Sequence, residues 1–159
     1  MSKLGNASLS TLLVGLVVTA QPVRAADLLN SPLTACPSDK TTIGGVNACG
    51  KVWKLGQGQA TLDQNGKLTV NVNGLVLNDA SVGHSNGTPD GVDAVAVAVV
   101  CGGKNGTLAA QAQPAPLSKD GNAQIATNLA IPRTCAEPIV LLRERYEGKI
   151  GGWLATTAK

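Results

Sequence analysis

The chain has 159 residues, which is the length of one domain, and it carries 13 basic residues, 10 acidic residues and a single histidine. Its formal net charge of +3 is too small for the basic surface that binds nucleic acid or an anionic membrane. Only 2% of the residues are aromatic, which leaves few platforms for stacking single-stranded bases or the rings of glycans. We therefore expect no nucleic-acid partner.

The first 25 residues have the three parts of an export signal. Lys3 supplies the positive start, Leu9 to Ala20 form a short apolar stretch, and Val23-Arg24-Ala25 resembles a signal-peptidase site. A membrane-spanning helix needs roughly 20 apolar residues, more than this stretch offers. We expect cleavage after Ala25, an exported protein that is periplasmic or extracellular, and no membrane contact after cleavage. An uncleaved N-terminal anchor is the alternative.

The residues after the predicted cut separate into two parts. They carry eleven basic and ten acidic residues, a net charge of +1. Residues 26–48 contain two prolines and few large apolar side chains, so we expect an extended N-terminal segment there. From residue 49 to residue 159, short apolar runs alternate with turn residues, which predicts a β-sandwich domain.

The clearest predicted hairpin covers residues 59–75. Its apolar residues alternate with polar ones, which indicates strands with one face toward the core and one toward water. Asn65-Gly66 supplies the positive-φ positions of a tight turn between the strands. The predicted core-facing residues are Ala60, Leu62, Leu68, Val70 and Val72.

Residues 93–101, DAVAVAVVC, have no charge after Asp93 on either face. Alternating valines predict a central strand, with the valines in the core and the alanines under a close neighbour. A short helix is the alternative, but the β-branched residues and the Gly102-Gly103 pair that follows argue against it.

Four later segments resemble strands, and three of them follow turns that contain glycine. No window longer than about ten residues shows the 3.6-residue period of a helix. The sequence therefore predicts an all-β fold, an immunoglobulin-like antiparallel β-sandwich of about seven or eight strands with two disulfides. The later strands are expected at residues 107–112, 122–130, 138–145 and 150–156.

Four cysteines follow the predicted export signal, and an even number in an exported chain indicates disulfides. Three pairings are possible. We favour Cys36 with Cys49, which ties the N-terminal segment to the first strand, and Cys101 with Cys135, which ties the end of one strand to the start of a later one. A zinc site is the competing interpretation, but no C-x-x-C spacing occurs and only one histidine is present.

The turn-rich stretch of residues 78–93 contains the only histidine, His84. A hydrolytic arrangement would combine His84 with Ser81 or Ser85 and a nearby aspartate. However, no G-x-S-x-G motif is present and such local residues rarely form a triad, so a surface-loop histidine is the favoured interpretation.

The same stretch offers oxygen ligands that suit calcium: Asp79, Asp90 and Asp93, with Asn78 and Asn86 nearby. No EF-hand spacing is present, and these residue types also stabilise turns. The calcium hypothesis stays open at this point. We expect no other metal and no cofactor.

Charged and aromatic residues offer two further candidates. Arg143 and Arg145 share a strand face near Lys149, which suggests an anion site or, as we favour, a solvated strand edge. Trp53 and Trp153 are expected to pack in or beside the core.

The C-terminal third contains three motifs that resemble those of small exported bacterial proteins. They are Val100-Cys101-Gly102-Gly103, the run from Cys135 to Arg143, and Gly152-Trp153-Leu154-Ala155. The resemblance supports the Cys101–Cys135 pairing and a bacterial origin, and it implies no activity. In composition alone, the chain is also similar to neocarzinostatin-like chromophore carriers, which are small exported immunoglobulin-like sandwiches with two disulfides.

Three functional hypotheses follow. The first is an exported non-enzymatic module with a structural or surface role. The second is an extracytoplasmic carrier of a small apolar ligand, which would need a deep apolar cleft between the sheets. The third is a hydrolytic enzyme that uses His84, which would need a polar cluster around that residue.

Overall fold

The structure is a computed structural model that describes residues 25–37 and 40–158. The predicted export signal lies outside these residues, except for Ala25. Within the described residues, no helix has the length and apolar character needed to cross a membrane.

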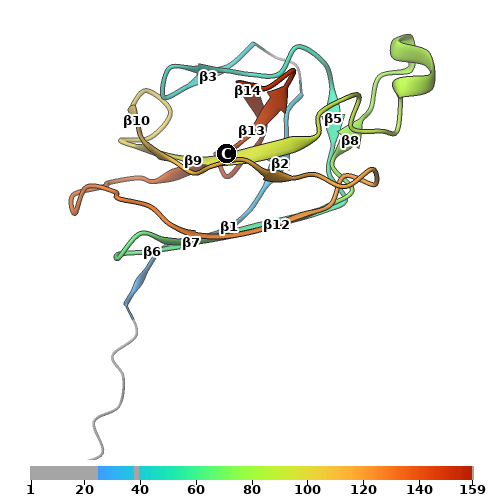
Figure 1. Ribbon diagram of the computed structural model, residues 1–159. Coiled ribbons are helices and arrows are strands. Elements are labelled where there is room, and N and C mark those ends of the chain that lie inside the picture. Colours follow the sequence, from blue (N-terminus) through green and yellow to red (C-terminus); the bar gives the residue numbers. More distant parts are fainter. Residues whose placement is uncertain (1–24, 38–39, 159) are drawn as a thin grey trace, which may run out of the picture.

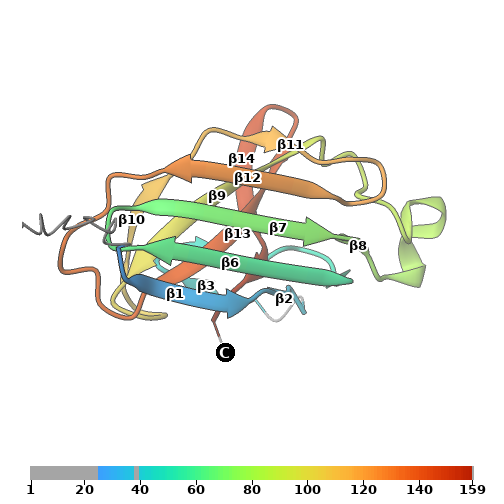
Figure 2. The ribbon, with the colours of Figure 1, turned by 90° about the horizontal axis from the view of Figure 1, so that it is seen from below.

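Two antiparallel sheets form the body of the fold (Figure 1). The first has the order β1 (Asp27–Pro32), β6 (Gln57–Asp63), β7 (Lys67–Asn73) and β12 (Ala123–Asn128). The second has the order β10 (Thr107–Gln111), β9 (Ala94–Cys101), β13 (Ile139–Tyr146), β14 (Lys149–Thr156) and β2 (Thr34–Ala35), and β11 (Ala115–Pro116) also pairs with β9. Figure 2 shows the first sheet from outside, with the second sheet crossing behind it.

Two short ribbons complete the sandwich. They pair β3 (Thr42–Ile43) with β4 (Val46–Asn47), and β5 (Trp53–Lys54) with β8 (Val76–Leu77). The 3-10 turn η1 (Ala80–Ser85) projects from one end of the molecule (Figure 1). Eight strands of the described part have five or more residues. The predicted all-β fold of seven or eight strands is thus confirmed, with short ribbons added.

The predicted hairpin is formed by β6 and β7. Ala60 pairs with Val70 and Leu62 with Leu68, and all four side chains are buried. In the connecting turn Gly66 has a φ of +81°, and the Asp63 carboxylate accepts the backbone N–H groups of Asn65 and Lys67. The alternation of the sequence therefore places its apolar face in the core, as predicted.

The run DAVAVAVVC also forms the predicted central strand. β9 lies between β10 and β13, and residues 94–100 are buried on both faces. Its alanine face carries the two arginines of β13, because Ala96 pairs with Arg143 and Ala94 with Arg145, and paired residues share a face.

The two arginines are not at a strand edge, which corrects the favoured interpretation. β13 pairs with β9 on one side and with β14 on the other. Arg143 donates to the Gly151 carbonyl at 3.0 and 2.8 Å and to Gln111 Oε1, and its partial burial lowers its pKa. Two arginines on one strand face suggested an exposed edge. They fit on a central strand because the alanines of the neighbouring β9 leave space for their long side chains.

The segment of residues 26–48 is extended, but it is also part of the sheets. β1 pairs with β6 at the edge of the first sheet, and β2 pairs with β14 in the second. The hydrophobic period is weak in β1 because none of its residues is fully buried. Residue 49 therefore does not mark the start of the sandwich.

Both predicted disulfides are present. Cys36 and Cys49 are bonded with a Cα–Cα distance of 6.2 Å, and Cys101 and Cys135 with one of 5.0 Å. None of the four cysteines is free. The zinc interpretation is therefore wrong, because disulfide sulfurs have no thiolate to offer a metal.

Candidate functional site

The loop after β8 holds most of the polar residues that the sequence singled out. Asp79 caps the first turn of η1, because its carboxylate accepts the backbone N–H of Ser81 at 3.0 Å and the Ser81 hydroxyl at 2.6 Å. These two hydrogen bonds lower the pKa of Asp79. Asp79 therefore has a structural role at the turn.

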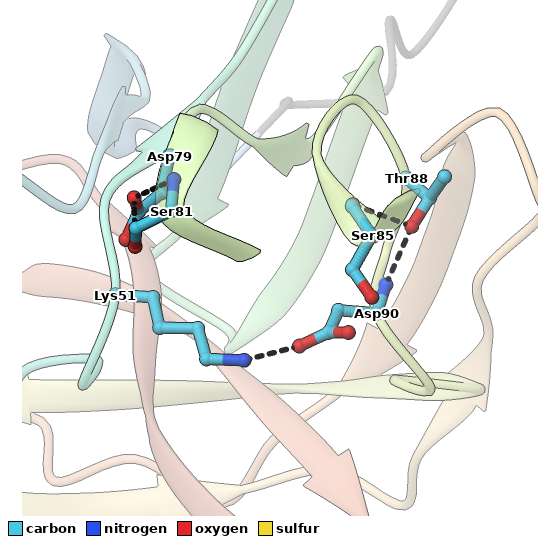
Figure 3. A network of polar contacts seen from close by, with 6 residues as sticks. All are labelled: Lys51, Asp79, Ser81, Ser85, Thr88 and Asp90. Atoms are coloured by element: carbon cyan, nitrogen blue, oxygen red, sulfur yellow. Dashed lines mark hydrogen bonds and ion pairs between the residues drawn. The ribbon is translucent and has the colours of Figure 1, made fainter. Parts of the chain in front are cut away.

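Asp90 lies at the other end of this loop and forms an ion pair with Lys51 (Figure 3). The hydrogen bond from Lys51 is the main cause that lowers the pKa of Asp90, and a hydrogen bond from Ser85 adds to it. The same contact raises the pKa of Lys51. Both groups are therefore charged over the ordinary pH range.

Removing this partner should be visible in the titration of Asp90. In a Lys51→Met variant we expect the pKa of Asp90 to rise toward the ordinary aspartate value, because the main stabilisation of the carboxylate is lost. The folded state of the parent protein favours the ionised form, so the contribution of Asp90 to stability is present at neutral pH and lost on acidification through its lowered pKa.

Carboxyl-carbon NMR over a pH series measures this shift. Asp79 is the internal control, because its pKa is lowered chiefly by Ser81 and should change little. An Asp90 pKa that is the same in both proteins would show that the ion pair does not form in solution.

The structure does not assemble the hydrolytic arrangement around His84. His84 is exposed on η1, and its side chain makes no hydrogen bond with another described residue. Ser81 is engaged by Asp79, and Ser85 by Asp90. The two serines are therefore engaged by carboxylates and not by the His84 imidazole.

The three aspartates proposed for calcium have separate partners. Asp79 binds Ser81, Asp90 binds Lys51, and Asp93 forms an ion pair of 2.7 Å with Arg145 of β13. In the part of the chain that the structure describes, no group of three or more histidine, cysteine, aspartate or glutamate side chains is gathered for a metal. The three aspartates are thus close together in the sequence, but in the structure each one serves a different local contact.

A different site lies beside Asp90, in a surface pocket of about 360 Å³. We call it the Trp53–Tyr146 pocket. Three segments meet there: the loop before β5, the loop after η1, and the end of β13. Its side chains are Lys51, Trp53, Asp90, Val92, Glu144 and Tyr146. Two of the three aromatic residues of the chain therefore converge on one charged concavity.

The fold holds the pocket walls in place. The Cys36–Cys49 disulfide fixes the segment that leads to Trp53, whose backbone N–H donates to the Cys36 carbonyl at 3.0 Å. Gly91 makes room for Tyr146, because a β-carbon there would lie 3.2 Å from the tyrosine ring. Glu144 Oε1 accepts the backbone N–H of Gly152 at 3.3 Å. The pocket is therefore preformed.

No pattern in the sequence predicts this pocket. Trp53 and Trp153 are buried, as predicted, but Trp53 also reaches the pocket, and Tyr146 is 48% exposed. Trp53 and Tyr146 are 93 positions apart, and no local pattern links them. The one available signal was the lone tyrosine next to a charged turn.

Comparison with known proteins assigns no family to the chain. No protein-family model, curated protein or solved structure matches it. The resemblances noted in the sequence stay predictions, and a function has to be argued from the structure itself.

Proposed function

We propose that the protein is an exported β-sandwich module that acts outside the cytoplasm through its surface, in a structural or binding role and without catalysis. The observation that carries the proposal is the continuous core. Side chains from both sheets fill the space between them, and Leu62, Val70, Val97 and Leu142 are among those with no exposure. The side chains considered for hydrolysis, Ser81, His84 and Ser85, lie outside this core on η1. The two serines are engaged by aspartates, and the side chain of His84 has no partner among the described residues.

The disulfides support the cellular address. Two buried or half-buried bridges join cysteines of the described part, and such bridges persist in oxidising compartments outside the cytoplasm. Ala25 lies just before β1, so cleavage after this residue would leave the whole sandwich intact.

The carrier hypothesis receives less support. A carrier of an apolar molecule needs an apolar cavity, most simply between the sheets. Three pockets of the described residues instead have charged or amide side chains in their walls, namely Asn71, Lys119 and Glu144. These features favour recognition at the surface.

Export can be tested with the full chain expressed in a bacterium with a C-terminal tag. We expect the protein outside the cytoplasm, beginning at Ala26, with no thiol that reacts after unfolding without reductant. Cell fractionation, N-terminal sequencing and thiol labelling measure the three properties.

A matched control replaces Ala25 with a bulky residue, Ala25→Trp, which signal peptidase should not accept. This variant should accumulate as uncleaved precursor. Extracytoplasmic protein of the parent sequence that still begins at Met1 or Ser2 would refute the cleavage site and, with it, the predicted mature chain.

A further inference from the structure

The Trp53–Tyr146 pocket contains polar groups with unused hydrogen-bonding capacity. No buried side-chain nitrogen or oxygen of the described residues lacks a partner, and Trp53 donates no side-chain hydrogen bond there. Its indole N–H must therefore reach the surface, although Trp53 is only 6% exposed. Trp53 also lines the pocket, so its rigid, largely buried indole is in place to contact a ligand there.

Acceptors accompany this donor. Glu144 uses Oε1 for the Gly152 N–H, and its Oε2 has no partner among the described residues. Lys51 spends one of its three N–H donors on Asp90. The pocket therefore presents donors and acceptors side by side, next to an exposed aromatic ring.

The charges limit what the pocket can bind. Lys51 offsets Asp90, and Glu144 leaves a local charge of −1. An anion would meet two carboxylates, and a cation would have to compete with Lys51 for them. A purely apolar molecule would leave these groups without hydrogen bonds, which is costly. A neutral ligand with many hydroxyl groups satisfies them, because each hydroxyl both donates and accepts.

We propose that the Trp53–Tyr146 pocket binds one pyranose unit of a neutral saccharide. The aliphatic C–H face of the sugar packs on the exposed Tyr146 ring, which supplies apolar surface with a polar end. The hydroxyl groups of the sugar donate to Glu144 and Asp90. They accept from Trp53 Nε1 and Lys51. A volume of about 360 Å³ is at the small end of the range for ligand pockets, so one ring of a longer saccharide would occupy it.

This inference rests on the proposed surface-binding role and names its ligand class. The chain provides its own internal reference for a test, because it has two indole N–H groups in different states. Trp153 Nε1 donates to the Thr41 carbonyl at 3.3 Å, whereas Trp53 Nε1 has no hydrogen-bond partner among the described residues. Their two resonances in a ¹H–¹⁵N spectrum of the oxidised protein report the pocket and a control site together.

The probes are four neutral tetrasaccharides, built from glucose in α or β linkage, from N-acetylglucosamine, or from xylose, each added to millimolar concentration. We expect at least one to shift the Trp53 indole resonance, assigned with Trp53→Phe, and to leave the Trp153 resonance unchanged. Tyr146→Ala should weaken binding about tenfold, whereas Tyr146→Phe should retain most of it.

Leu108→Ala is the matched control, because Leu108 is the other exposed large hydrophobic residue of the described part and lies on β10, outside the pocket. It should bind as the parent protein does. The proposal is overturned if none of the four probes shifts the Trp53 resonance, or if Tyr146→Ala binds as well as Leu108→Ala.

The saccharide proposal and the surface-module proposal can each fail without the other. An exported and oxidised protein that binds none of the probes leaves the surface-module proposal standing and removes only the saccharide. Signals of the tetrasaccharide in the same sample report its hydrolysis, which would contradict the non-enzymatic proposal but not binding at the pocket.

Discussion

Replacing Cys101 and Cys135 with alanine is expected to lower the free energy of unfolding by about 4 kcal/mol. The bridge spans 34 positions, so its loss releases a long loop in the unfolded chain. It also joins the end of β9 to the segment that leads into β13, the two strands at the centre of the second sheet. A loss of this size is a large part of a typical domain stability of roughly 5–15 kcal/mol.

The double replacement of Cys36 and Cys49 is the matched comparison. Its span of 13 positions gives a loop-closure contribution of about 3 kcal/mol. Complete burial of Cys36 adds a packing loss, so we expect the two variants to differ by less than about 1 kcal/mol. Urea unfolding without reductant, followed by Trp fluorescence, measures both. A loss below about 1 kcal/mol in either variant would contradict the assignment of that bridge as a main support of the fold.

The second large effect is expected from Gly121→Ala, at more than about 3 kcal/mol. Gly121 lies in the turn before β12 with a φ of +74°, and its carbonyl accepts the Leu75 N–H at 2.9 Å. A β-carbon at this position would lie 2.2 Å from the Leu75 carbonyl oxygen. Leu75 is fully buried, so its backbone has little freedom to move away.

Gly148→Ala separates the two causes of this loss. Gly148 has a nearly equal φ of +76°, but a β-carbon there meets no atom within 4 Å. Its replacement should cost only the backbone strain of a left-handed residue, about 1–2 kcal/mol. Thermal unfolding of the two variants measures the difference. Equal losses would show that the close approach at Leu75 relaxes easily.

Local patterns predicted the parts of the fold that depend on near neighbours. The β6–β7 hairpin follows from a period of two and from Asn65-Gly66, and β9 follows from its alternating valines. The disulfide pairing followed from the predicted strands, because each bridge joins cysteines that are only 13 or 34 positions apart in the sequence. In each case the information lies within a few tens of residues.

Pairings between distant segments could not be read in this way. β2 pairs with β14 over more than 110 positions, and β1 lacks a buried face that would mark it as a strand. The Trp53–Tyr146 pocket has the same character, because the tertiary fold alone brings its three segments together. The polar residues around His84 suggested a site because they are close together in the sequence. In the structure, most of their hydrogen bonds stabilise the turns of this loop.

The connectivity of the two disulfides bears on the order in which they can form. Each bridge joins cysteines that follow one another along the chain, Cys36 with Cys49 and then Cys101 with Cys135. A chain that crosses a membrane N-terminus first would expose the first pair before Cys101 emerges. Oxidation in order of emergence would then give the native bridges directly, without the thiol–disulfide exchange that crossed pairings require. Maturation of this protein would therefore need a thiol oxidant but no disulfide isomerase.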